Sequence, residues 1–290
     1  MSGLGQPFVV AAFVAGTPVA AAAGVVGYFL SVRAQVFVSD VLGHVSYAGA
    51  VAALAFGVDP RIGLFAATVG VGLVIGVLGP RARSDDVAIG GVLAWSLGLG
   101  AFFLTLYAQS AGDGAASVNY LFGSIFGLTM GRAWVSAGVA LAVTALVVGV
   151  ARPLLFASLD GAVAGARGVP VRALGLVLLV ATGVVAAEAS QVTGALLLLG
   201  LVAAPAGAAG RLTNRPFAAL WLSCALAVAS LWGGLILAVA VPILPPSFAI
   251  LALAGGTHLA VAGARPAFRV ASLIGRAMAA RLETGSSALS

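Results

Sequence analysis

The chain has 290 residues, of which 62% are hydrophobic and only 8% are charged, and its mean hydropathy is +1.17. Soluble domains carry about 25% charged residues, so this composition excludes a soluble protein and indicates an integral membrane protein. The apolar runs are about 20 residues long, which fits membrane-spanning helices and is too long for barrel strands. We therefore predict an all-α, polytopic transmembrane helix bundle with eight or nine spans.

The formal net charge of +6 comes from arginine alone, since all 14 basic residues are Arg. They are spread over short loops, as topology signals are, and do not form a nucleic-acid-binding patch. A chain without lysine cannot contain the phosphate-binding loop of ATPases, so any ATP hydrolysis would belong to a partner chain. We find no catalytic constellation and predict that the chain is not itself an enzyme. Its one cysteine, Cys224, excludes an internal disulfide and a cysteine-cluster metal site.

Nine apolar segments are predicted to span the membrane. Their approximate bounds in chain order are 7–32, 34–57, 62–78, 85–107, 133–150, 171–187, 192–210, 216–241 and 246–264. The segment 155–170 is rich in small residues and too short to span, which predicts a short interfacial helix with Gly168 at its C-cap. Residues 1–264 then form one transmembrane domain, and 265–290 form an amphipathic cytoplasmic tail.

Two local features of these spans predict contacts. Gly72 and Gly76 form a G-x-x-x-G pair in the third span, a pattern that lets two membrane helices pack closely. The stretch from Glu188 to Gln191 is a brief polar break between the sixth and seventh spans. We expect both of these side chains at the outer rim, as contacts for an extracytoplasmic protein or simply as a solvated turn.

The arginines predict the orientation of the bundle. If the turn at Arg33 is cytoplasmic, nine alternating spans place twelve arginines inside, and only Arg61 and Arg132 outside. Such a bias follows the positive-inside rule. It predicts a multi-pass protein of the cell membrane with its N-terminus outside and its C-terminus in the cytoplasm.

Asp40 and His44 lie four residues apart in the second span, inside an otherwise apolar stretch. On a helix, residues i and i+4 share one face. A carboxylate and an imidazole placed there are suitable ligands for a divalent cation such as Zn²⁺, Mn²⁺ or Fe²⁺. Ionisable side chains at membrane depth usually face a protein interior or a water-filled path. The spacing therefore predicts a transient metal site on a transport route, or else a buried Asp–His pair that only joins two helices.

Four stretches resemble one protein family in order and spacing. Asp40 to Gly49 (D-V-L-G-H-V-S-Y-A-G) is similar to its G-D-x-L-S-H-x-x-x-x-G motif, although Ser39 and Gly43 stand where Gly and Ser are usual. Asp86 to Gly90 resembles its D-x-A-I-G motif, and Asn119 to Ser124 its Y-L-F-G-S/N element. The fourth stretch, Gln191 to Ala209, is similar to its V-G-x-L-L…P-A-A-x-A pattern. The chain thus resembles the permeases of metal-importing ABC transporters, those for zinc, manganese and iron.

This resemblance implies the membrane-spanning subunit of an importer for divalent metal ions, Zn²⁺ or Mn²⁺ and possibly Fe²⁺ as the transported ion. It implies a second permease, either another copy of this chain or a different one, together with two ATP-binding subunits and an extracytoplasmic metal-binding protein as partners. It also implies that Asp40 and His44 bind the metal. The segment 155–170 would be the coupling element that docks on the ATPase, and its residues expected to contribute are Phe156, Asp160, Ala164 and Gly168.

Two other functions compete with this one. A permease for a metal chelate, of the siderophore or cobalamin type, tends to need a wider cavity and no ligand pair within a helix. A stand-alone secondary transporter for cations would need no ATPase, so co-purification with an ATP-binding subunit separates it from an importer.

Overall fold

The computed structural model describes residues 5–79, 86–111, 121–195 and 198–264, and every regular element in these ranges is a helix. Eight of the helices are long and apolar enough to cross a membrane, which confirms the predicted polytopic helix bundle. The bounds of the helices are α1 Pro7–Val32, α2 Val36–Ala55, α3 Pro60–Leu78, α5 Asp86–Ala111, η1 Ile125–Gly127, α7 Met130–Gly149, α8 Ala151–Leu159, α9 Gly161–Ala166, α10 Val171–Thr193, α11 Leu198–Leu212, α12 Pro216–Ala240 and a last helix Pro246–Ala264.

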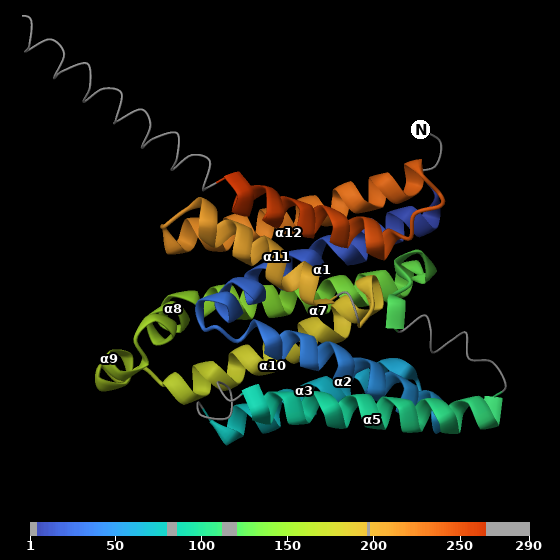
Figure 1. Ribbon diagram of the computed structural model, residues 1–290, viewed down its shortest axis with the longest axis horizontal. Coiled ribbons are helices and arrows are strands. Elements are labelled where there is room, and N and C mark those ends of the chain that lie inside the picture. Colours follow the sequence, from blue (N-terminus) through green and yellow to red (C-terminus); the bar gives the residue numbers. More distant parts are fainter. Residues whose placement is uncertain (1–4, 80–85, 112–120, 196–197, 265–290) are drawn as a thin grey trace, which may run out of the picture.

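The long helices lie roughly side by side, with α5 and α12 along opposite edges of the bundle (Figure 1). Helix α1 packs against α7, α11 and α12, and α10 packs against α2 and α3, so α1 and α10 form the interior. The outer helices expose large apolar side chains such as Trp95, Phe102 and Trp232. In a bilayer such faces lie against lipid, and association therefore depends on close packing and on polar contacts between helices.

Glycines bring several helix pairs to backbone contact. Gly49 of α2 and Gly63 of α3 face each other so closely that a Cβ atom at either would overlap the carbonyl oxygen of the other. Gly72 and Gly76 lie against Leu179 and Leu176 of α10. The tight face predicted from the G-x-x-x-G pair is thereby confirmed, and its partner is α10.

The prediction that the polar stretch 188–191 breaks a helix was wrong. Helix α10 continues through it to Thr193 and ends at Gly194, whose φ is +87°. The polar side chains do not terminate the helix because each finds a partner inside the bundle. Helix α11 then begins at Leu198, so the predicted seventh span, 192–210, is displaced toward the C-terminus.

The described residues around the turn between α10 and α11 lie inside the protein. Val192, Thr193, Ala195 and Leu198 are each 1% exposed or less. Helix α11 has 15 residues, a length of about 22 Å at 1.5 Å per residue, which is short of a hydrocarbon core of about 30 Å. Non-helical backbone at membrane depth is tolerated where protein covers it, and this turn meets that condition.

Candidate functional site

Asp40 and His44 lie on α2, as their spacing predicts, and both side chains are half-buried in the single chain. Nothing in α2 interrupts the helix, since it contains no proline and consists mainly of Ala, Val, Ser and Gly. Within the described ranges, no group of three or more His, Cys, Asp or Glu side chains lies together in a way that could hold a metal ion. At this place one chain therefore offers only two side chains of the types that bind metal ions.

The opposite side of α2 is fixed to the rest of the bundle. The hydroxyls of Ser46 and of Ser190 in α10 lie 2.7 Å apart and share a hydrogen bond, and both are buried. Because successive residues of a helix are rotated by about 100°, Ser46 and His44 point to opposite sides of α2. Gly43 lies against the carbonyl oxygen of Ala195 in the α10–α11 turn. The backbone and the hydroxyl pair thus hold α2 while the Asp40–His44 face stays turned away from α10.

Two further stretches of the family resemblance meet at the end of α10. Gly123, with a φ of +80°, and Gly194, with a φ of +87°, lie backbone against backbone. The amide N–H of Ser124 donates to the carbonyl oxygen of Gln191 at 3.3 Å. Residues 119 and 120 of the stretch lie outside the described residues. The short segment Leu121–Ser124 therefore packs on the buried α10–α11 turn.

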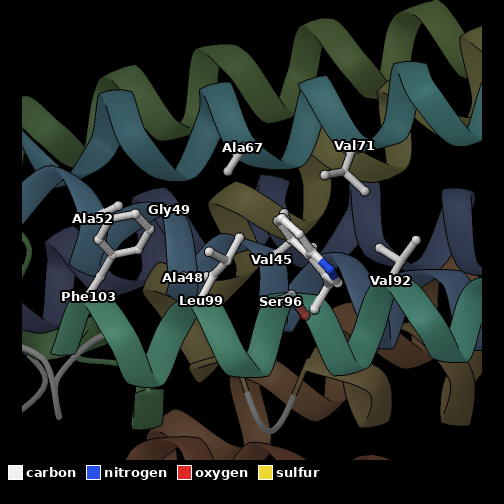
Figure 2. A pocket seen from close by; sticks show the side chains of 11 residues that line it. Val45, Ala48, Gly49, Ala52, Ala67, Val71, Val92, Ser96, Leu99 and Phe103 are labelled. Atoms are coloured by element: carbon white, nitrogen blue, oxygen red, sulfur yellow. The ribbon is translucent and has the colours of Figure 1, made fainter. Parts of the chain in front are cut away.

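An apolar cavity of about 250 Å³ lies between α2, α3 and α5. Figure 2 shows Val45 and Ala48 of α2, Ala67 and Val71 of α3, and Phe103 of α5 around it. Its one hydroxyl group, that of Ser96, donates to the carbonyl oxygen of Leu93 in its own helix. A cavity without free oxygen or nitrogen ligands does not suit a metal ion, so the candidate metal site lies elsewhere on α2.

Glu188 and Gln191 are not arranged as the outer-rim prediction expects. Glu188 is only 1% exposed, and one of its carboxylate oxygens accepts from Nε2 of Gln191 at 3.3 Å. Its other carboxylate oxygen lies 3.9 Å from Nη2 of Arg61, at the start of α3. Gln191 is half-buried and also donates to the carbonyl oxygen of Ala187. As placed here, Glu188 offers no surface to a partner protein.

The other histidine, His258, packs between α11 and the last helix. Nδ1 of His258 lies 3.2 Å from the carbonyl oxygen of Ala204 in α11, and its ring fills the space beside Gly207.

The segment 155–170 forms two short helices instead of the one that the sequence predicts. They are α8, which begins at Ala151, and α9, and the chain turns between them at Asp160. The Asp160 carboxylate caps α9 by accepting from the amides of Ala162 and Val163, at 3.0 and 2.9 Å. Phe156 of α8 is half-buried, and Ala164 of α9 is fully buried.

Gly168 ends α9 in the way that the sequence predicts. Its φ is +81°, the amide of Gly168 donates to the carbonyl of Gly165, and the amide of Val169 donates to the carbonyl of Ala164. This pair of bonds is the Schellman arrangement, for which glycine is the usual residue. Helix α9, the second half of the segment 155–170, is thus capped at both ends by residues of this segment.

Helices α8 and α9 project from one end of the bundle (Figure 1). Leu159 is 67% exposed and Val163 45% exposed on this projection, and Arg152 and Arg167 are exposed beside them. The Nε of Arg33, in the α1–α2 turn, donates to the hydroxyl of Ser158 at 2.7 Å. The α1–α2 turn and the projection therefore lie at the same end of the bundle.

Comparisons with known proteins agree over most of the chain. The model of the family described as the ABC 3 transport family matches residues 6–263. The manganese transport system membrane protein MntC of Halalkalibacterium halodurans is 29% identical over 213 residues, which cover 73% of this chain and 72% of that protein. The manganese import system permease protein ScaB of Streptococcus pneumoniae is 30% identical over 217 residues, which cover 73% and 74%.

Two solved structures resemble the bundle. The structure of PsaBC from Streptococcus pneumoniae in complex with Fab matches with a TM-score of 0.78 and 25% identity, over 90% of this chain and 93% of that one. A metal-chelate type ABC transporter in an inward-facing conformation matches with a TM-score of 0.62 and 19% identity, over 88% and 84%. The second likeness concerns the fold alone.

Proposed function

This chain belongs to the ABC 3 transport family, and we propose that it is the permease that carries Mn²⁺ into the cell, with Zn²⁺ as the second candidate ion. The half-buried Asp40–His44 pair, in a bundle whose relatives are named as manganese permeases, is the observation that carries this proposal. The two side chains by themselves suit either ion. The relatives' names favour Mn²⁺.

The metal site is completed by a second copy of the chain. Two ligands hold a divalent ion weakly, whereas a two-fold axis beside α2 would bring two Asp40 and two His44 together. The two carboxylates would then balance the charge of the ion. The half-exposed Asp40–His44 face of α2 is available for this contact, because the glycine and serine contacts of the helix lie on other sides.

The two ligands have different roles. The carboxylate of Asp40 attracts the cation, whereas the neutral imidazole of His44 selects against Ca²⁺ and Mg²⁺, which prefer oxygen ligands. A site of this kind is open enough to release its ion, as transport requires. The apolar lining of the nearby cavity supplies no competing ligand.

The permease works with three kinds of partner. Two ATP-binding subunits hydrolyse ATP on the cytoplasmic side, a second permease copy completes the pore, and an extracytoplasmic metal-binding protein delivers the ion. The N-terminus lies outside and the C-terminus inside. The projecting helices α8 and α9 dock on the ATP-binding subunit, with Leu159 and Val163 as apolar contacts.

ATP-driven uptake in proteoliposomes tests the function. The chain is reconstituted with its ATP-binding subunit and its metal-binding protein, and uptake of Mn²⁺ and of Zn²⁺ is measured separately. Uptake of Mn²⁺ that stops when the ATP-binding subunit cannot hydrolyse ATP supports the proposal. Uptake that continues without ATP hydrolysis would make the protein a secondary transporter. Uptake of Zn²⁺ but not of Mn²⁺ would make Zn²⁺ the transported ion.

Removing the cap of α9 tests the docking element. The variant Asp160→Ala loses both capping bonds, at a cost of about 1 kcal/mol in a helix of only six residues that has little stability of its own. We expect up to about 5-fold weaker association with the ATP-binding subunit, since a change of about 1 kcal/mol corresponds to this factor. Co-purification from membranes measures it.

A matched control for this variant is Thr213→Ala. Thr213 also makes a local bond to a backbone amide, that of Arg215, in the loop between α11 and α12. This loop lies on the same side in the proposed topology but outside the docking element, so association should not change. Equal association of the Asp160→Ala variant and the wild type would contradict the assignment of α8 and α9.

A further inference from the structure

A buried charge cluster joins three helices away from the Asp40–His44 face. Nη2 of Arg61, on α3, donates to the hydroxyl of Ser136 on α7 at 3.0 Å and lies 3.9 Å from a carboxylate oxygen of Glu188 on α10. The side chain of Glu188 is 2% exposed and that of Arg61 16% exposed. Arg61 is at the start of α3 and Ser136 is in the first half of α7, so the cluster lies toward the end of the bundle opposite α8 and α9.

The position of Arg61 does not favour its own helix. It is the second residue of α3, where the helix dipole is positive and a cation is unfavourable. Burying Glu188 has a desolvation cost as well, and a buried ion pair is weak evidence for a gain in stability. Neither charge stabilises the helix that carries it. We therefore attribute the pair to the particular arrangement of α3 and α10 that it holds in place.

The pair is not closed in the tightest way that its side chains allow. An Arg–carboxylate pair can form two parallel hydrogen bonds at 2.7–2.9 Å, but the distance here is 3.9 Å. Within the part of the chain that the structure describes, Nε of Arg61 has no hydrogen-bond partner. Because the two side chains are not joined by paired hydrogen bonds, they can separate or move closer without breaking such bonds.

The residues that follow Glu188 connect this pair to α2. Ser190 shares its hydrogen bond with Ser46 of α2, and the carbonyl of Gln191 accepts from the amide of Ser124. Gln191 also donates to Glu188 itself. One turn of α10 therefore holds α3 and α7 through Glu188, α2 through Ser190, and the Leu121–Ser124 segment through Gln191.

We propose that Arg61 and Glu188 form an ionic latch that holds the end of α10 and the buried α10–α11 turn against α2, and that opens when the permease switches access between the two sides of the membrane. The proposal rests on the proposed import function. It makes Arg61 and Glu188 positioning residues, which act on transport through the placement of α2 and do not bind the ion.

The first test measures how many ATP molecules are hydrolysed for each Mn²⁺ taken up by the reconstituted complex. Glu188→Gln keeps nearly the same shape, Arg61→Gln leaves a shorter polar side chain, and each variant removes one charge. We expect about fivefold or more ATP per ion in both variants, because the loss of one partner of a buried pair weakens a defined conformation. The charge-swapped double variant Arg61→Glu/Glu188→Arg should return to within about twofold of the wild type.

Arg132→Gln is the control, since Arg132 is an exposed arginine near the start of α7 and lies outside the cluster. The Arg132→Gln variant should hydrolyse the same number of ATP molecules per Mn²⁺ as the wild type. A purely structural pair predicts a different result, in which uptake and ATP hydrolysis fall together and their ratio stays constant. That outcome would overturn the latch. A charge-swapped variant that hydrolyses as many ATP molecules per Mn²⁺ as the single variants would overturn it too.

A second measurement does not depend on metal transport. Hydrogen exchange of the backbone amides of residues 189–195 is followed in the purified complex without added metal. We expect exchange about tenfold faster or more in Glu188→Gln and Arg61→Gln, and wild-type exchange in Arg132→Gln. Unchanged exchange in both charge-removing variants would overturn the latch even if Mn²⁺ import is established. Faster exchange in these variants of a complex that takes up neither Mn²⁺ nor Zn²⁺ would support the latch and refute the import function.

Discussion

Replacing Asp40 or His44 by alanine is expected to abolish ATP-driven Mn²⁺ uptake while the complex still assembles. In a two-fold dimer, each substitution removes two of the four proposed ligands. Changes around metal ligands alone cost about 10- to 100-fold in affinity, so loss of the ligands themselves should lower uptake by about 100-fold or more. Both side chains are half-buried on a helix that is fixed through other faces, so folding should be little affected.

Tyr47→Phe provides the matched control for the two alanine variants. Tyr47 lies one turn after His44 on α2, is half-buried, and packs on Gly100 of α5. The substitution removes only a hydroxyl group. Uptake and the amount of assembled complex are measured for all three variants. Wild-type uptake in Asp40→Ala and in His44→Ala would refute the metal site and leave the pair a structural role.

Replacing Gly194 by alanine is expected to prevent correct folding. Gly194 has a φ of +87° and a ψ of 157°, a region that glycine alone adopts readily. A Cβ atom there would also overlap the backbone of Leu121 and Phe122. Neither the turn nor the facing segment can move away without exposing backbone in the bundle. We expect a loss of more than about 3 kcal/mol, combining backbone strain with overpacking.

The yield of monodisperse protein in detergent and its thermal unfolding measure this effect. Gly138→Ala serves as the control, because Gly138 lies on an exposed face of α7 and nothing is within 4 Å of a Cβ atom there. An alanine in a helix interior is favoured over glycine by about 0.5–1 kcal/mol, so this variant should be as stable as the wild type or slightly more stable. A Gly194→Ala protein of normal yield and stability would contradict the described turn.

Local patterns in the sequence were enough to predict much of the bundle. The bounds of α1 and the end of α3 at Leu78 agree with the prediction, because they follow from apolar length and from Gly and Pro at the ends. The packing face of Gly72 and the cap at Gly168 are also confirmed. Both depend on the absence of a side chain, which allows close helix packing at Gly72 and a positive φ at Gly168.

The end of α10 shows where local patterns fail. Glu188, Ser190 and Gln191 are typical of a polar break, yet their partners Arg61, Ser46 and Ser124 lie far away in the chain. Long-range contacts of this kind override local polarity. Gly194 was the available signal for the helix end, because glycine is the usual residue just after a helix. Arg61 was a second signal, as a cation at the start of a helix needs a partner.

Of the candidate site, the sequence could predict only what one chain determines. It placed Asp40 and His44 on one helix, and the structure adds that this helix is anchored through Ser46 and Gly43. The proposed completion of the site by a second copy depends on a surface that no spacing within one chain can specify. The Asp40–His44 metal site therefore stays a prediction.

The shortness of α11 has a consequence for the biogenesis of the protein. A helix of 15 residues that contains Pro205 is a poor independent substrate for insertion into the bilayer, whereas the 23 residues of α10 are long enough. The two helices should therefore enter the membrane together, as a hairpin whose tip is the turn at Gly194. The tip exposes backbone polar groups until α2 and the segment Leu121–Ser124 cover it, and both are synthesised earlier. Covering the tip therefore depends on the earlier, correct placement of α2 and of the segment Leu121–Ser124.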